Sequence, residues 1–158
     1  MYISRIGEYM RFDAVLFDLD GTLANTLQDL ALSVNYVLKN EGYPTHPIDA
    51  YKYFAGDGIL KMIERALPAE KRSHQLISNL KDKFLEYYSV HYADFTTAYD
   101  GLISLIKALK SKGVKLAVVT NKAQDMAGTI VVVQGAITNI QHLVEFFFYL
   151  LSYFFFFL

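Results

Sequence analysis

The chain has 158 residues and a nearly balanced charge, with 15 basic and 16 acidic side chains and a formal net charge of −1 at pH 7. This balance gives no broad positive field, so neither nucleic acid nor an anionic membrane is an expected partner. Cysteine is absent, which excludes disulfides and thiolate metal sites, and the first residues lack the pattern of a secretory signal, so we expect a cytoplasmic protein.

The first predicted element is a strand followed by a polar loop. Residues 12–17 form a short, mostly apolar run, and the sequence Asp-Leu-Asp-Gly-Thr follows it directly. Such a run predicts a buried strand, and Gly21 supplies turn chemistry after it. Asp18 and Asp20 are therefore expected at the carboxyl end of this strand.

Three helical patterns come next. Apolar residues recur every three or four positions over residues 23–40, and similar patterns run over about residues 48–67 and 70–92. A glycine-rich segment interrupts the middle pattern, at Gly56-Asp57-Gly58. Taken alone, this segment fits a plain turn about as well as a loop that selects a substrate.

A fourth helical pattern leads into a second strand. Helical periodicity covers residues 102–110, and an apolar run at 114–119 ends in Thr120 and Asn121. The order of strand, long helical segment, helix and strand predicts an α/β fold with a helical insertion. We expect residues 1–23 and 97–135 to form a partial α/β core. Residues 24–96 are expected to form a helical cap, and residues 136–158 an atypical apolar tail.

The polar residues at the two strand ends suggest phosphoryl-transfer chemistry. Ligands of an open parallel sheet bind beyond the carboxyl ends of its strands, so Asp18 and Thr120 are expected to meet there. One carboxylate of a pair can attack phosphorus while the other carries the proton of the leaving oxygen. A cation must offset the repulsion between carboxylate and phosphate, so we expect Mg²⁺ with Asp18 and Asp20 as oxygen ligands. The Thr120 hydroxyl and nearby N–H groups would hold the phosphoryl oxygens.

The two motifs resemble signatures of the haloacid dehalogenase-like hydrolase superfamily. The first signature is matched by Asp18-Leu19-Asp20-Gly21-Thr22-Leu23, and the second by Val118-Val119-Thr120-Asn121-Lys122. Each motif alone is weak, because an Asp-X-Asp at a strand end is more often turn chemistry and a threonine there is more often a helix cap. Together, over residues 10–130, they resemble the phosphoglycolate phosphatases. The implied fold is an incomplete Rossmann-like core with an inserted helical cap and an apolar C-terminal tail.

The resemblance implies hydrolysis of a small phosphorylated metabolite through an aspartyl phosphate. It makes Asp18 the nucleophile and Asp20 the general acid and base. It assigns Mg²⁺ to the Asp18 carboxylate and the Asp20 backbone carbonyl. It places phosphate binding at Gly21, Thr22, Thr120 and Asn121. It also implies that a cap loop closes over the substrate, formed by Gly56, Asp57 and Gly58.

The similarity does not extend over the last part of the chain. The family's third signature is a lysine and its fourth an acidic pair, yet Lys122 is the last basic residue and only Asp125 and Glu145 carry charge beyond it. With fewer anionic ligands, metal binding is expected to be weak. Two functions therefore stay open: hydrolysis of a phosphomonoester, or an inactive, truncated family member.

The tail has an unusual composition. Seven of the twelve phenylalanines fall between residues 146 and 157, and the strongly apolar run covers 143–158. This run is shorter than the roughly 20 residues of a bilayer-spanning helix. We favour a change of reading frame between about residues 127 and 135 over a membrane anchor.

Overall fold

A computed structural model describes residues 12–120, 122, 126–128 and 130. The tail predicted for residues 136–158 lies outside these described residues, as does Asn121 of the predicted phosphate site. Among the helices of the described residues, none combines the length and apolar character needed to cross a bilayer.

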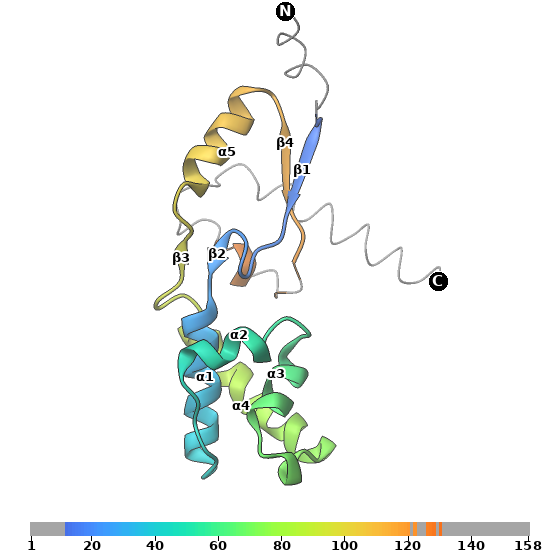
Figure 1. Cartoon of the computed structure of the whole chain (residues 1–158), viewed down its shortest axis with the longest axis vertical. Helices are drawn as coiled ribbons and strands as arrows, with labels where there is room; N and C mark the ends of the chain where they lie inside the picture. Colours follow the sequence, from blue (N-terminus) through green and yellow to red (C-terminus); the bar gives the residue numbers. More distant parts are fainter. Residues whose placement is uncertain (1–11, 121, 123–125, 129, 131–158) are drawn as a thin grey trace, which may run out of the picture.

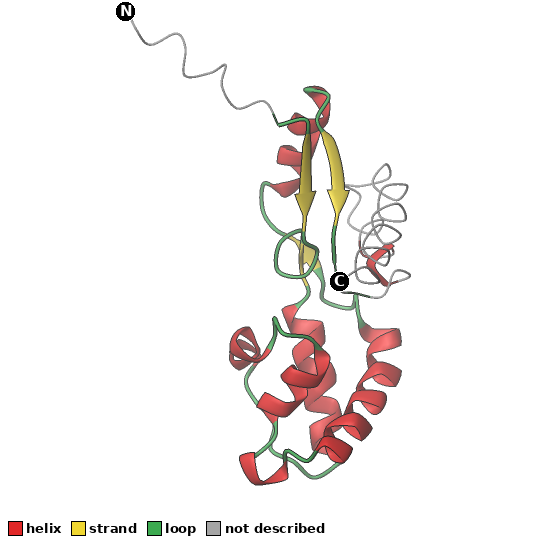
Figure 2. Ribbon diagram, turned by 90° about the vertical axis from the view of Figure 1, so that its right-hand side faces the viewer, coloured by secondary structure: helices red, strands yellow, loops and turns green. Residues whose placement is uncertain are grey.

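Two parallel strands and one helix form what we call the sheet unit. The strands are β1 (Ala14–Phe17) and β4 (Lys115–Val118), and the helix is α5 (Leu102–Ser111). The register pairs the first residues of the two strands and likewise their last residues, so both strands end at the same edge. Figures 1 and 2 show α5 against one face of the strands. These elements match the strands and helix predicted for residues 12–17, 114–119 and 102–110.

β1 differs from the fully buried strand that its sequence predicts. Val15 and Phe17 pack against the apolar cluster of the sheet unit, whereas Leu16 is 54% exposed. Successive side chains of a strand point to opposite faces, and α5 covers one of these faces. In β4 the buried side chains lie on both faces and comprise Leu116, Ala117 and Val118.

Four α-helices form what we call the helical unit. They are α1 (Leu27–Asn40), α2 (Tyr51–Phe54), α3 (Ile59–Ala66) and α4 (His74–His91), with 3₁₀ turns at Ile48–Ala50 and Ala69–Lys71. A buried apolar cluster joins these helices, and its largest members, Tyr51 and Phe84, have no exposed surface. The periodic apolar residues predicted these helices. However, the predicted middle helix is split into α2 and α3 by the glycine-rich segment.

Two short antiparallel strands connect the units. β2 (Ala24–Asn25) leads into α1, and β3 (Thr97–Ala98) leads back from α4 to the sheet unit. Both views show this pair between the two units (Figures 1 and 2). The buried carboxylate of Asp29, in the first turn of α1, accepts hydrogen bonds from the Phe95 N–H at 2.9 Å and the Thr96 hydroxyl at 2.6 Å. Asp29 thus links the start of α1 to the segment that leads from α4 to β3.

Candidate active site at the strand ends

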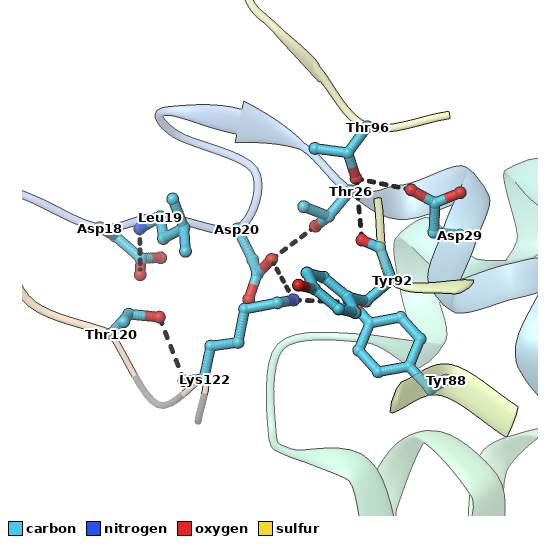
Figure 3. A network of polar contacts seen from close by, with 10 residues as sticks. All are labelled: Asp18, Leu19, Asp20, Thr26, Asp29, Tyr88, Tyr92, Thr96, Thr120 and Lys122. Atoms are coloured by element: carbon cyan, nitrogen blue, oxygen red, sulfur yellow. Dashed lines mark hydrogen bonds and ion pairs between the residues drawn. The ribbon is translucent and has the colours of Figure 1, made fainter. Parts of the chain in front are cut away.

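The carboxyl ends of β1 and β4 bring the two sequence motifs to one edge. Asp18 follows β1 directly, and Thr120 lies two residues beyond β4. The Val119 N–H donates to the Phe17 carbonyl at 2.7 Å, so the two segments continue side by side past the strands. Figure 3 shows Asp18 and Thr120 at this shared edge. The predicted juxtaposition is present, and the roles given to these residues stay predictions.

A tight turn after β1 orients the two aspartates. The Leu19 carbonyl accepts hydrogen bonds from the N–H groups of Leu23 and Ala24, both at 2.9 Å. The side chains of Leu19 and Leu23 are buried in the apolar cluster of the sheet unit. The buried side chain of Leu19 points into the apolar cluster. Its neighbours Asp18 and Asp20 are more exposed to solvent than Leu19 is. The turn therefore fixes the spacing of the carboxylates.

Gly21 allows this turn to close. Its φ is +79°, in the left-handed region, and its N–H donates to the Ala24 carbonyl at 2.8 Å. Gly21 and Thr22, both predicted to contact phosphate, are exposed. The helix α1 begins at Leu27 instead of residue 23, because Ala24 and Asn25 form strand β2 and pair with β3.

Replacing Gly21 with alanine is expected to lower the free energy of unfolding by about 1–2 kcal/mol, because alanine must adopt a left-handed conformation there. An added Cβ would have no atom within 4 Å, so backbone strain and not a clash causes the loss. Urea denaturation measures it. Gly21→Asn is the matched variant, since asparagine tolerates this conformation better, and equal losses in both variants would contradict this cause.

Asp18 is open to solvent at the strand edge. It is exposed, and its Oδ1 accepts a hydrogen bond from the Leu19 N–H at 2.7 Å. Among the described residues, the side-chain hydrogen bonds of Asp18 involve this one oxygen. The arrangement orients the carboxylate while leaving its second oxygen available to a ligand or an electrophile.

Asp20 is held by two donors from different segments. Its Oδ1 accepts from the Thr26 hydroxyl at 2.7 Å and from the Lys122 ammonium at 2.9 Å. Thr26 is buried just before α1, and Lys122 follows β4 by four residues. Asp20 therefore receives an orientation and a counter-charge that the exposed Asp18 does not share.

Lys122 is the residue of this site to which sequence reasoning gave no role. Its side chain is 5% exposed, and its ammonium also donates to the Tyr88 hydroxyl at 2.6 Å (Figure 3). Burial, and secondarily the charge of Asp20, raises the pKa of the Tyr88 hydroxyl well above its ordinary value. The sequence signal for a role of Lys122 was its place in the second motif, two residues after Thr120. The sequence did not indicate its partners, because Asp20 and Tyr88 are distant along the chain.

Thr120 lies close to its predicted position but is less accessible than Asp18. It is 9% exposed, and its hydroxyl oxygen accepts a hydrogen bond from the Lys122 N–H at 3.2 Å. This bond leaves the hydroxyl proton free to be donated elsewhere, which suits a group that binds phosphoryl oxygen. Its motif partner Asn121 lies outside the described residues.

The predicted cap loop lies on the helical unit. Gly56, Asp57 and Gly58 are exposed, and Asp57 forms an ion pair with Arg65 of α3. Arg65 also donates to the Phe54 carbonyl at 3.0 Å, so one guanidinium joins the middle of the loop to the end of α2. In Figure 1 the α2–α3 connection lies on the side of the helical unit that faces the strands. The side-chain contacts of the loop are thus made within the helical unit.

The oxygen donors near Asp18 suit a hard cation. The Asp18 carboxylate, through the oxygen that does not attack, and the Asp20 main-chain carbonyl are ligands of the type that Mg²⁺ prefers. The Asp20 carboxylate is engaged by Lys122 and Thr26, which favours its carbonyl as the donor. Within the part of the chain that the structure describes, no group of three or more acidic or histidine side chains is arranged for a metal. Within these described residues, the Asp18 carboxylate and the Asp20 carbonyl are the oxygen donors that fit.

The chain is similar to curated phosphoglycolate phosphatases. It is 36% identical over 121 residues to the enzyme of Neisseria meningitidis, an alignment covering 74% of this chain and 51% of the relative. It is 39% identical over 118 residues to that of Pasteurella multocida, covering 71% and 53% respectively. The chain spans about half the length of the curated relatives it matches.

Solved structures and a family profile agree with these relatives. A predicted phosphoglycolate phosphatase from Haemophilus somnus matches with a TM-score of 0.70 and 30% identity, covering 85% of this chain and 61% of that one. A phosphoglycolate phosphatase candidate from Lactobacillus delbrueckii matches with a TM-score of 0.74 and 27% identity, covering 82% and 64%. The predicted fold, a partial α/β core with a helical insertion, is thereby confirmed. The profile described as haloacid dehalogenase-like hydrolase matches residues 15–146, and the chain belongs to this family.

Proposed function

We propose that this chain carries the nucleophile of a phosphoglycolate phosphatase-like enzyme, which hydrolyses a small phosphomonoester through an aspartyl phosphate. The observation that supports the proposal is the meeting of Asp18 and Thr120 at one edge of two parallel strands. An exposed, oriented carboxylate is placed there beside a buried hydroxyl. The names of the relatives add the substrate class, a small phosphorylated metabolite.

In the proposed reaction, the available Asp18 oxygen attacks phosphorus and the bond from phosphorus to the ester oxygen breaks. Asp20, when protonated, gives its proton to the departing oxygen. Water then attacks phosphorus, Asp20 takes back a proton, and the acyl phosphate on Asp18 separates into free carboxylate and inorganic phosphate. The hydrogen bonds from Thr26 and Lys122 hold Asp20 in place for both proton transfers.

The remaining predicted site residues have supporting parts in the same proposal. The Thr120 hydroxyl binds a phosphoryl oxygen, and the exposed residues Gly21 and Thr22, together with Asn121, complete the phosphate-binding set. Mg²⁺, held by Asp18 and the Asp20 carbonyl, would offset the repulsion between carboxylate and phosphate when bound.

We further propose that residues 24–96 act as a cap over a core of residues 1–23 and 97–135. Support comes from the separate apolar clusters of the helical and sheet units, which let each unit keep its own packing. The exposed loop of Gly56, Asp57 and Gly58 would then approach the substrate when the cap closes. Closure would exclude water from the reacting phosphorus.

Trapping of the intermediate tests the proposed function. The full chain is incubated with Mg²⁺ and a small phosphomonoester, then quenched with hydroxylamine, which converts an acyl phosphate into a hydroxamate. Peptide mass analysis is expected to find the hydroxamate on Asp18, because that carboxylate has the exposed oxygen.

Fragmentation of the labelled peptide distinguishes the two aspartates of the motif. A hydroxamate on Asp20 would contradict the assignment of nucleophile and proton carrier. The same incubation without phosphomonoester is the control for chemical modification. No label on any aspartate would favour the other function that the sequence left open, an inactive family member.

A further inference from the structure

The ammonium of Lys122 connects α4 of the helical unit to Asp20 of the sheet unit. Its Nζ lies 2.9 Å from the Asp20 carboxylate and 2.6 Å from the Tyr88 hydroxyl oxygen. It also lies 5.0 Å from the centre of the Tyr88 ring. Figure 3 shows the Lys122 side chain reaching from the loop after β4 to both partners. One buried cation is therefore shared by two segments that are 68 residues apart in sequence, from position 20 to position 88.

Burial makes both partners of Lys122 necessary. Its side chain is 5% exposed, so the ammonium has little access to water. A lysine ammonium has three N–H donors, and a buried donor without an acceptor is costly. Asp20 supplies the balancing charge, and Tyr88 supplies a neutral acceptor together with the face of its ring. Without the Tyr88 hydroxyl, the Lys122 ammonium loses one of the two acceptors that fix its position.

The position of Tyr88 is itself well determined. It is 3% exposed and belongs to the apolar cluster of the helical unit. Its ring stacks on Phe84, with ring centres 5.0 Å apart and planes at 16°. Because the ring is fixed by packing on α4, its hydroxyl moves only when α4 moves.

We propose that Tyr88 is a positioning residue, which acts through Lys122 to make the orientation of the Asp20 carboxylate depend on the position of α4. With α4 in the described position, the Asp20 Oδ1 accepts hydrogen bonds from both Thr26 and Lys122. When α4 is displaced, the Lys122 ammonium loses the Tyr88 hydroxyl as an acceptor and is free to shift away from Asp20. Of these two hydrogen bonds, Asp20 then keeps only the one from Thr26. The consequence for turnover rests on the proposed function of Asp20, whereas the contact itself does not.

A carboxyl resonance reports this coupling without any need for catalysis. The full chain is prepared with ¹³C-labelled aspartate, and the Asp20 side-chain carboxyl signal is assigned with Asp20→Asn. Both Tyr88→Phe and Lys122→Met are expected to change its chemical shift, since each alters the position or presence of the ammonium. Tyr88→Phe keeps the ring and its stacking on Phe84, so the fold is expected to be retained.

Tyr87→Phe is the matched control on the same helix. The Tyr87 ring stacks on Tyr36 and on His91, away from the Lys122 contacts, so loss of its hydroxyl should leave the Asp20 signal unchanged. If Lys122→Met moves the signal and Tyr88→Phe does not, Tyr88 is only a neighbour and the proposal is overturned. A signal that moves in neither variant would also overturn it, because Lys122 would then not contact Asp20.

Turnover gives a second readout where the parent chain is active. Tyr88→Phe is expected to lower kcat several-fold with little change in KM, because the altered group orients a proton carrier and does not bind the substrate. An unchanged kcat with a changed resonance would mean that the coupling exists but does not limit the reaction. An inactive parent would contradict the proposed function and leave the test by resonance intact.

Discussion

Replacing Asp18 with asparagine is expected to reduce phosphate release from a small phosphomonoester on the order of 10³-fold or more. The amide lacks the anionic oxygen that attacks phosphorus, yet it has the same shape. Its carbonyl oxygen can still accept from the Leu19 N–H, so the turn after β1 should persist. The measurement is kcat for inorganic phosphate release in the presence of Mg²⁺.

Asp82→Asn provides the matched control for this substitution. Asp82 lies on α4 with a side chain 69% exposed, and it has no part in the contacts at the strand ends. We expect this variant to keep the parental rate. An Asp18→Asn variant that also keeps that rate would exclude Asp18 as nucleophile. Rates near zero for all three proteins would instead support an inactive family member.

Replacing Phe84 with alanine is expected to lower the free energy of unfolding by about 3–5 kcal/mol. Phe84 has no exposed surface and lies at the centre of the apolar cluster that joins the helices. The substitution removes the ring that stacks on Tyr88 and leaves a cavity between α4 and its neighbours. Because a typical domain is stable by only 5–15 kcal/mol, the helical unit should unfold at a much lower urea concentration.

Val90→Ala is the control for this stability measurement. Val90 lies near the end of the same helix and is 71% exposed, so its truncation should change the free energy of unfolding by less than about 0.5 kcal/mol. Circular dichroism at 222 nm follows the loss of helix during urea denaturation of each variant. Similar losses for Phe84→Ala and Val90→Ala would contradict the central place of Phe84 in the packing.

The sequence was sufficient for the parts of the fold that depend on local patterns. The two apolar runs predicted β1 and β4, and periodic apolar residues predicted α1, α4 and α5. The adjacency of Asp18 and Thr120 was also predictable, because polar residues at the ends of parallel strands meet at one edge. The exposure of Leu16 could not be predicted from the sequence, because it depends on which face of the small sheet is covered.

The contacts of Lys122 show why the rest could not be predicted. Its partners Asp20 and Tyr88 lie 102 and 34 positions away, and each belongs to a different element. No local periodicity relates such positions, and the sequence of α4 does not indicate which of the adjacent residues Tyr87 and Tyr88 contacts Lys122. Only the packing of α4 beside the strand ends selects Tyr88 as the partner. For the same reason, the short β2 and β3 pair, two residues in each strand, carried no recognisable signal.

The hydrogen bonds of Asp29 have a mechanical consequence for any movement of one unit relative to the other. Over residues 12–120 the chain passes between the units twice, and Asp29 joins the outgoing passage to Phe95 and Thr96 of the incoming one. Because β2 and β3 are also paired, the two passages behave as one ribbon. Bending of that ribbon would swing α1 and α4 together, whereas sliding one helix along the other would require the buried carboxylate to lose both of its donors.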